Sequence, residues 1–209
     1  MRSENETVGQ QRSFIEEARR RQIIAAAVDL IAEIGYGNAS LAKIAEHAGI
    51  SKGVISYHFD GKDDLMTQLV IQLYVSGAEF MTPVIAAAVG PRNRLRAYIA
   101  SNLDFIDANK QYVAAMTDVV LNLRDAEGQL KFTYAEGAEE ILRPLVDMLR
   151  EGQRDSVFGD FDPLLMAKSI RDAIDGTAGR AIQESDFDVH RYTAHLCRLF
   201  DLATISQGE

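Results

Sequence analysis

The residues best suited to bind another molecule gather in one short segment, Ser40 to Lys62, with the sequence SLAKIAEHAGISKGVISYHFDGK. An ammonium group such as that of Lys52 can donate hydrogen bonds to the O6 and N7 acceptors of guanine in the DNA major groove. Hydroxyl and aromatic side chains beside it can contact phosphates or base edges. The segment therefore predicts a surface that binds nucleic acid, and the candidates for its exposed face are Lys52, Gly53, Ser56, Tyr57 and His58.

Two short helices joined by a tight turn must position these side chains. Ser40 can cap the first helix and Ser51 the second, and Gly49 can take the left-handed conformation that ends the first. Val54 and Ile55 form the expected buried side of the second helix. The inner face of the first helix has apolar residues at i, i+3, i+4 and i+7, namely Leu41, Ile44, Ala45 and Ala48. This spacing predicts a helix-turn-helix that reads DNA.

The segment from about Arg19 to Leu69 resembles the N-terminal domain of the TetR family of transcriptional regulators. The matching parts are the amphipathic first helix RRQIIAAAVDLIAEIGY, the step Asn38-Ala39-Ser40, the turn Ala48-Gly49-Ile50-Ser51, the run Tyr57-His58-Phe59, and Lys62 at the start of the next helix. By specific motif the resemblance covers roughly a quarter of the chain. The rest is similar to the family only in length and all-helical character.

The resemblance implies which residues hold the DNA backbone. Tyr57 and His58 occupy positions that contact phosphates in the family, and Phe59 packs inward to fix the loop that follows. Lys62, at a helix N-terminus, offers a charge and backbone donors to a phosphate, and the Ser40 hydroxyl can do the same. Capping alone would equally explain Ser40, and packing or plain surface exposure would explain Tyr57 and His58.

Base reading is expected to depend on Lys52, for which an ordinary solvated lysine is the alternative. Gly53 lets the backbone come close to the duplex, and Ser56 can bond to a base or a phosphate. Ala42 departs from the founding members of the family, where an arginine can read bases, because its methyl group forms no hydrogen bond. The predicted DNA-binding residues are Ser40, Ser51, Lys52, Gly53, Ser56, Tyr57, His58 and Lys62.

The net charge of −9 at pH 7 would by itself argue against a nucleic-acid partner. Its distribution weakens the objection, because residues 1–60 hold 7 Lys and Arg against 8 Asp and Glu, a balance of −1, and the later residues carry −8. DNA affinity depends on basic groups close to the phosphates rather than on the whole chain. The candidates for that role are Arg19, Arg20, Arg21, Lys43, Lys52 and Lys62.

Composition also bounds the class of protein and its compartment. Of the 209 residues 47% are hydrophobic, which is ample for a core. The single cysteine, Cys197, cannot form an intramolecular disulfide. No run approaches the roughly 18 apolar residues of a membrane span, and no stretch resembles a signal peptide. We therefore expect a cytoplasmic protein without a membrane partner.

Helical periodicity and the lack of sustained strand alternation predict an all-α fold of about nine helices. We expect a disordered tail at 1–17, a three-helix helix-turn-helix DNA-binding domain at 18–65, and a ligand-binding and dimerisation domain at 66–209. Pro144 should kink or split the helix that contains it. Besides the two motif helices, the expected helices are 15–34, 62–80, 92–107, 110–123, 127–152, 161–184 and 187–205.

The last two expected helices carry apolar stripes that could meet a second copy of the chain. In the family that the sequence resembles, these helices form a four-helix dimer interface, and small residues such as Gly176 and Gly179 would allow close approach. Reading a two-fold symmetric site also requires a dimer. Packing within one chain is the alternative. The predicted interface residues are Ile174, Ala178, Ile182, Tyr192, Leu196, Leu199 and Phe200.

Residues 92–152 mix aromatic and Met side chains with a few polar ones, as in a small-molecule pocket between helices. Core packing would produce the same pattern. An apolar or amphipathic effector is expected, and Asp118, Asp172 or Asp175 would favour a cation only if one of them were buried without a partner. The predicted ligand-binding residues are Tyr98, Asn102, Phe105, Tyr112, Met116, Asn122, Phe132 and Tyr134.

These features together predict a ligand-responsive repressor that binds a palindromic operator as a homodimer. An all-helical enzyme and a protein-interaction adaptor are the alternatives. Against an enzyme, the sequence has no nucleophile elbow, no HExxH, no phosphate-binding glycine loop and no clustered metal ligands. We therefore expect no catalytic residues, no metal site and no cofactor.

Overall fold

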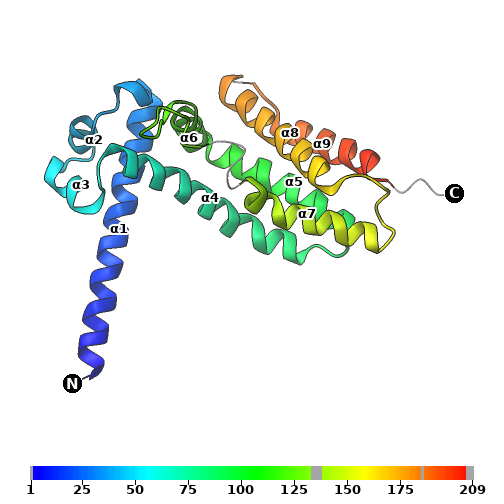
Figure 1. Cartoon of the computed structure of the whole chain (residues 1–209), viewed down its shortest axis with the longest axis horizontal. Helices are drawn as coiled ribbons and strands as arrows, with labels where there is room; N and C mark the ends of the chain where they lie inside the picture. Colours follow the sequence, from blue (N-terminus) through cyan, green and yellow to red (C-terminus); the bar gives the residue numbers. More distant parts are fainter. Residues whose placement is uncertain (1, 133–137, 185, 206–209) are drawn as a thin grey trace. The chain divides into compact units, whose positions relative to one another are not determined.

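The computed structural model describes residues 2–132, 138–184 and 186–205. Every regular element in these ranges is a helix, and the only β pairings in them are two isolated bridges, Arg124 with Leu130 and Phe158 with Ile205. The predicted all-α fold is confirmed. The elements are α1 (Arg2–Ile34), the 3₁₀ helix η1 (Tyr36–Asn38), α2 (Leu41–His47), α3 (Lys52–His58), α4 (Lys62–Ala87), α5 (Pro91–Ala108), α6 (Lys110–Asn122), α7 (Ala138–Arg154), α8 (Pro163–Gln183) and α9 (Val189–Ala203), as labelled in Figure 1.

The chain divides into two compact units. The first unit comprises Met1–Leu73 and Ala114–Lys131, and the second comprises Tyr74–Val113 and Phe132–Glu209. Helix α4 therefore gives its first half to the first unit and its second half to the second. Since most of α6 packs with the first unit, this division does not follow the expected boundary at residue 65, and the functional boundary stays a prediction.

The first unit is built on the second half of α1, against which α2 and α3 lie, while the first half of α1 extends away from them (Figure 1). The helix begins at Arg2, so its first turns fall where the sequence predicts a disordered tail. The core of the unit includes Ile23, Ala27, Ile31, Ile44, Ile55, Phe59, Leu65 and Leu69. Complete burial of one Ile, Leu or Phe side chain contributes about 1.5–3 kcal/mol to stability.

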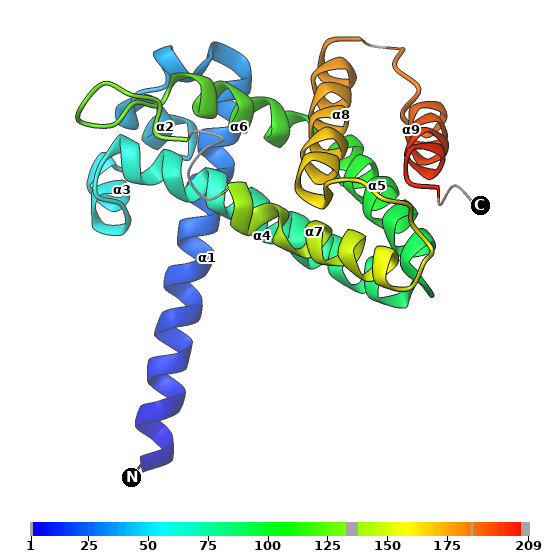
Figure 2. The same cartoon turned by 45° about the vertical axis from the view of Figure 1, so that its right-hand side comes forward.

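The second unit is arranged around α5, which packs against α7, α8 and α9 (Figure 2). Helix α8 also contacts α7 and α9. Apolar residues recur on α5 at four-residue spacing and meet the stripes of the neighbouring helices. The core of the unit includes Leu95, Ile99, Leu103, Leu145, Leu149, Ile170, Ile174, Leu196 and Phe200.

Besides the start of α1, two helix boundaries differ clearly from the predicted ones. Residues 127–132 are not helical, and α7 is described from Ala138. The Asp125 carboxylate accepts hydrogen bonds from the backbone of Glu127 and Gln129, at 3.0 and 2.8 Å, in a turn closed by Gly128 at φ +80°. Helix α4 continues past Pro83 to Ala87, since the ring removes one backbone donor close to the exposed end of the helix.

The expected break at Pro144 is absent, since α7 runs on from Ala138 to Arg154 through this residue. Both Pro144 and Glu140 are exposed. The carbonyl that loses its helical donor, four residues before the proline, is therefore open to water.

One described helix, α4, is long and apolar enough to cross a bilayer by length and composition, although no such span is expected from the sequence. These criteria alone are weak evidence for a membrane segment. Its first half carries Leu65, Met66, Leu69 and Leu73 into the core of the first unit. Its second half leaves Tyr74, Val75, Phe80 and Val84 exposed.

Candidate nucleic-acid interface

The turn between α2 and α3 has the predicted geometry. The Ser40 hydroxyl accepts a hydrogen bond from the backbone of Lys43 at 3.3 Å and caps α2. Gly49 has φ +64°, and the backbone N–H of Ile50 bonds to the Ala45 carbonyl at 2.9 Å. Ser51 stands at the N-cap position of α3, but its side chain makes no capping bond, so this part of the prediction is wrong.

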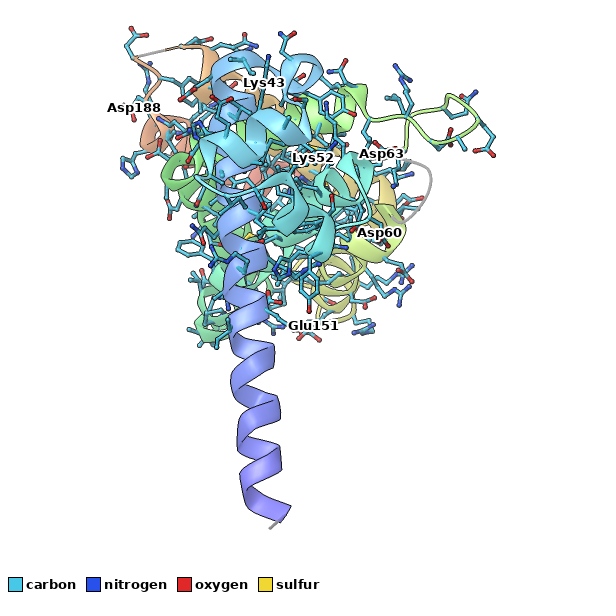
Figure 3. All side chains as sticks on the ribbon, turned by 90° about the vertical axis from the view of Figure 1, so that its left-hand side faces the viewer. Lys43, Lys52, Asp60, Asp63, Glu151 and Asp188 are labelled. Carbon is cyan, nitrogen blue, oxygen red and sulfur yellow. The ribbon has the colours of Figure 1, made fainter. Side chains whose placement is uncertain are left out.

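Helix α3 separates a packed face from an open one. Ile55 is fully buried and Val54 is half-buried, whereas the Tyr57 side chain is 73% exposed. The side chain of Lys52 is exposed and forms no ion pair or hydrogen bond with the described part of the chain. Figure 3 shows Lys43 on α2 and Lys52 on α3. The predicted residues that the structure leaves exposed are Ser40, Ser51, Lys52, Gly53, Ser56 and Tyr57.

The loop after α3 is held by Arg20, which the sequence analysis assigns to DNA. Its guanidinium donates a hydrogen bond to the carbonyl of His58 and lies 4.3 Å from the centre of the Phe59 ring. Phe59 is 2% exposed, as predicted, and the rings of Tyr57 and His58 stand nearly perpendicular with centres 5.0 Å apart. Arg20 therefore positions the Tyr57-His58 pair, and its charge is engaged inside the first unit.

Lys62, the predicted phosphate ligand, is engaged in the same way. Its ammonium donates a hydrogen bond to the Tyr36 carbonyl at 2.8 Å and lies 4.1 Å from the centre of the Tyr36 ring. Burial lowers the pKa of Lys62, and the charges of Asp63 and Asp118 oppose this shift. The backbone N–H groups of the first turn of α4 remain the donors that a phosphate could use there.

Tyr36 also connects α6 to the head of the first unit, as we call residues 18–65, and this link is not predicted from the sequence. Its backbone N–H donates to the Asp118 carboxylate at 2.7 Å, and the Asn122 amide bonds to the other oxygen of that carboxylate at 2.8 Å. The preceding Gly35 has φ +78°, which allows the chain to turn into η1. We refer to Tyr36, Lys62 and Asp118 as the Tyr36 junction. No local sequence pattern reveals it, since 82 residues separate Tyr36 from Asp118.

Three of the predicted ligand-binding residues come together on one face of α5. Tyr98, Asn102 and Phe105 follow i, i+4, i+7 spacing. Asn102 is 4% exposed and its amide donates to the Tyr98 carbonyl at 2.8 Å. The ring of Phe105 lies 5.8 Å from that of Phe80 on α4.

The other predicted ligand residues do not join this face. Tyr112 is half-buried in the second unit, and burial raises its pKa to about 12. Met116 and Asn122 belong to the first unit, where Asn122 is exposed. Phe132 is half-buried in the second unit, and Tyr134 lies outside the described residues.

A charged residue that the sequence analysis misses, Arg171 on α8, faces Asn102. One of its terminal nitrogens donates to the Asn102 amide oxygen at 3.0 Å, and its Nε donates to Asp175 Oδ1 at 2.9 Å. Burial alone would lower the pKa of Arg171, but its hydrogen bond and ion pair with Asp175 outweigh this, and the pKa is raised.

Asp175 and Asp118 both accept hydrogen bonds. Neither is therefore the buried, unpaired carboxylate that would favour a cationic effector. Asp172, the third carboxylate considered, is exposed. A hollow of about 730 Å³ in the second unit lies elsewhere, along the α7–α8 connection and the end of α9. Its lining contains none of the predicted ligand-binding residues that the structure describes.

The predicted dimer residues divide by their burial within one chain. Those already buried are Ile174, Ala178, Leu196 and Phe200, whereas Tyr192 is half-buried and Ile182 and Leu199 are exposed. A Cβ added at Gly176 or Gly179 would meet no atom within 4 Å. The exposed positions of α8 and α9, which we call their open face, therefore include apolar side chains beside these unobstructed glycines, among them Leu165, Ile182, Leu199 and Leu202.

Comparison with known proteins places the helix-turn-helix in a described family. The family model "Bacterial regulatory proteins, tetR family" matches residues 23–69. The transcriptional regulator BetI 1 of Chromohalobacter salexigens is 38% identical over 93 residues, which are 44% of this chain and 46% of that protein. The chain thus matches less than half the length of this relative. The transcriptional repressor KstR2 of Rhodococcus jostii is 28% identical over 156 residues, 74% of this chain and 75% of that protein.

Solved structures show the same fold over nearly the whole chain. The fatty acid degradation regulator FadR of Bacillus halodurans superposes with a TM-score of 0.73 at 23% identity, covering 88% of this chain and 94% of that one. The ketosteroid regulator KstR2 of Mycobacterium tuberculosis gives 0.71 at 20% identity, with coverage of 90% and 96%. The curated relatives are transcriptional regulators rather than enzymes, in agreement with the expectation from the sequence. Together with the helix-turn-helix geometry, these similarities support a regulator of the tetR family, whose family model matches residues 23–69 of the chain.

Proposed function

We propose that the chain is a ligand-responsive transcriptional repressor, which binds a palindromic operator as a homodimer and is released by a small apolar or amphipathic effector. The observation that carries the proposal is the open face of α3, where Lys52 and Tyr57 are exposed while Ile55 behind them is fully buried. Such a face suits the major groove, with Lys52 on base edges and Tyr57 on a phosphate. A cytoplasmic location follows from this role.

The homodimer is supported by the open face of α8 and α9. Its exposed apolar side chains and its two unobstructed glycines, Gly176 and Gly179, suit close packing of helices from a second copy. Two heads related by a two-fold axis would read half-sites about one DNA turn apart, roughly 34–36 Å. The operator should therefore be a palindrome or close to one.

The effector is proposed to contact the α5 face that carries Tyr98, Asn102 and Phe105. The relatives support an apolar or amphipathic compound, since one is named a fatty acid degradation regulator and another a ketosteroid regulator. Repression is supported by the name of the Rhodococcus jostii relative, a transcriptional repressor. A ligand can release DNA only through a difference in its affinity for the two forms of the protein, so operator must weaken effector binding in return.

A gel-shift titration with the DNA upstream of the protein's own coding sequence tests the proposal. We expect nanomolar-range affinity that falls steeply as salt rises, because each phosphate contact releases counterions. Titrating one effector with and without the operator then tests the regulation. Equal affinity in both titrations would show that the effector site does not control the DNA-binding face.

A further inference from the structure

We propose that Arg171 is the anchor for the anionic head group of the effector, a carboxylate joined to an apolar body, and that Asp175 is the partner which this carboxylate displaces. The inference rests on the proposed function, because it assigns a chemical class to the effector of that regulator.

The first support is that the guanidinium of Arg171 is only partly satisfied. It has five N–H donors, and the structure shows three hydrogen bonds, one to Asn102 and two to Asp175. Both bonds to Asp175 end on the same oxygen, Oδ1, rather than on two oxygens side by side. An incoming carboxylate could instead accept two parallel bonds, which is the stronger arrangement for an arginine.

The second support is that Asp175 is a replaceable partner. It follows Arg171 by four residues on the same helix, and an acidic residue placed after the basic one is the less favourable order for such a pair. The Asp175 side chain is 37% exposed and can turn toward water, whereas that of Arg171 is 23% exposed. Water and a small solute can therefore reach the pair, although most of the arginine is enclosed.

The third support is the change from polar to aromatic surroundings along α5. Asn102, which bonds to Arg171, is followed one helical turn later by Phe105. Phe105 contacts Phe80 on α4, and a Cβ added at Gly77 would stand 3.4 Å from the Phe105 ring. A ligand whose charged end meets Arg171 could therefore lay its apolar body against these rings.

A structural role alone explains the pair less well. Burying a charged pair costs desolvation, and apolar residues of similar volume commonly serve a helical core as well or better. A cationic ligand would meet the guanidinium charge, and the carboxylate that could attract it is already bonded to Arg171. An anion is the ligand that this arrangement favours.

Titration calorimetry of the full-length protein with dodecanoate, in the absence of DNA, tests the proposal. Dodecanamide, which has no charge, and dodecyltrimethylammonium, which is a cation, are the matched probes. We expect dodecanoate to bind more tightly than either. Equal binding of dodecanamide, or no binding of dodecanoate, would overturn the proposal.

Two variants of the pair should act in opposite directions. Arg171→Met should weaken dodecanoate binding roughly tenfold to a hundredfold, since it removes charge-assisted hydrogen bonds. Asp175→Asn should tighten binding severalfold, because the competing carboxylate is lost. A purely structural pair predicts instead that both variants weaken binding or leave it unchanged, and either result would refute the proposal.

Arg94→Met is the matched control, since Arg94 on α5 forms a comparably exposed ion pair with Glu151, at 2.8 Å. This variant should not affect dodecanoate binding.

If Arg171→Met does not fold, as judged by circular dichroism, the binding of dodecanoate to Asp175→Asn and Arg171→Lys tests the proposal instead. The lysine keeps the charge but loses the planar donor pair, so it should bind less tightly than the wild type.

Failure of the inference can be told apart from failure of the proposed function. Binding of dodecanoate that depends on Arg171 but does not release the operator in a gel shift would uphold the anion site and refute the effector response. Specific operator binding with no affinity for dodecanoate would uphold the DNA-binding function and refute the anion site.

Discussion

Two basic residues, one in each unit, hold their charges in opposite ways. On α3 in the first unit Lys52 is exposed and unengaged within the described chain, whereas Arg171 in the second unit is enclosed and bonded to Asn102 and Asp175. A surface that meets DNA gains from groups that keep their bonding capacity for phosphates and bases. An enclosed charge needs an internal partner until a ligand replaces it. The difference shows why basic residues in one chain cannot all be assigned to DNA.

The contrast is also present inside the first unit. Lys62 and Arg20 are basic residues of the DNA-binding region, but each donates a hydrogen bond to a backbone carbonyl and lies over an aromatic ring. Lys52 has no such contacts within the described chain. Variants can separate the residues that hold the head together from those that remain free.

The largest expected effect comes from the buried side of the head. Phe59→Ala should lower the free energy of unfolding by about 3–5 kcal/mol, because it removes a ring that is 2% exposed and leaves a cavity. Tyr57→Ala, two positions away, should change it by less than about 0.5 kcal/mol but weaken binding to all DNA sequences. Chemical denaturation and gel shifts measure the two effects. A Tyr57 variant as unstable as the Phe59 variant would show that Tyr57 is a packing residue.

The next effect separates the two lysines. Lys52→Ala should relax specificity at one base pair of each half-site by about 1–3 kcal/mol, as measured with a set of mutated operators. Lys62→Ala should weaken binding to all operators alike and also lower stability, because its contacts with Tyr36 are lost. An unaltered ranking of operators with Lys52→Ala would mean that Lys52 does not read a base.

A smaller effect is expected at the Tyr36 junction. Asp118→Ala removes the acceptor of the Tyr36 backbone N–H and should destabilise the first unit by about 1–2 kcal/mol. Hydrogen exchange at that amide should increase, since its bond is broken. Asn122→Ala is the milder comparison, because it removes only the amide bond to the other Asp118 oxygen and leaves the acceptor of the Tyr36 N–H in the chain. Equal exchange in the two variants would show that Asp118 does not restrain the turn.

The smallest effect compares the two serines at the helix starts. Ser40→Ala should cost about 1 kcal/mol of stability, because the hydroxyl caps α2. Ser51→Ala should cost less, because its side chain makes no capping bond in the structure. Thermal denaturation ranks the two. A larger loss for Ser51 would place its hydroxyl in the capping role that the sequence suggested.

The sequence predicts the head well because its determinants lie close together. The cap at Ser40, the left-handed Gly49 and the buried Ile55 and Phe59 all follow from residue types within one short segment. The open face of α3 then follows from the periodicity of a helix whose other face is known. Short-range spacing is sufficient for this part of the candidate site.

The engagement of the charged groups could not be predicted in the same way. Arg171 meets Asn102 across 69 residues, and Tyr36 meets Asp118 across 82. Only the packing of separate helices decides such pairs, and an arginine on a helical stripe looks the same whether or not it finds a partner. The late start of α7 is different, because the Asp125 to Gly128 turn has a local signal that could have been recognised.

The most direct test of the central claim is a fluorescence anisotropy titration of labelled upstream DNA, with the wild type and the double variant Lys52→Ala/Tyr57→Ala. We expect the wild type to bind one palindromic segment far more tightly than unrelated duplex, with an affinity that falls steeply as salt rises. The double variant should keep its helical content and melting temperature and lose this preference. Equal binding by the two proteins, or equal affinity of the wild type for every duplex, would contradict the assignment of α3 as the DNA-reading helix.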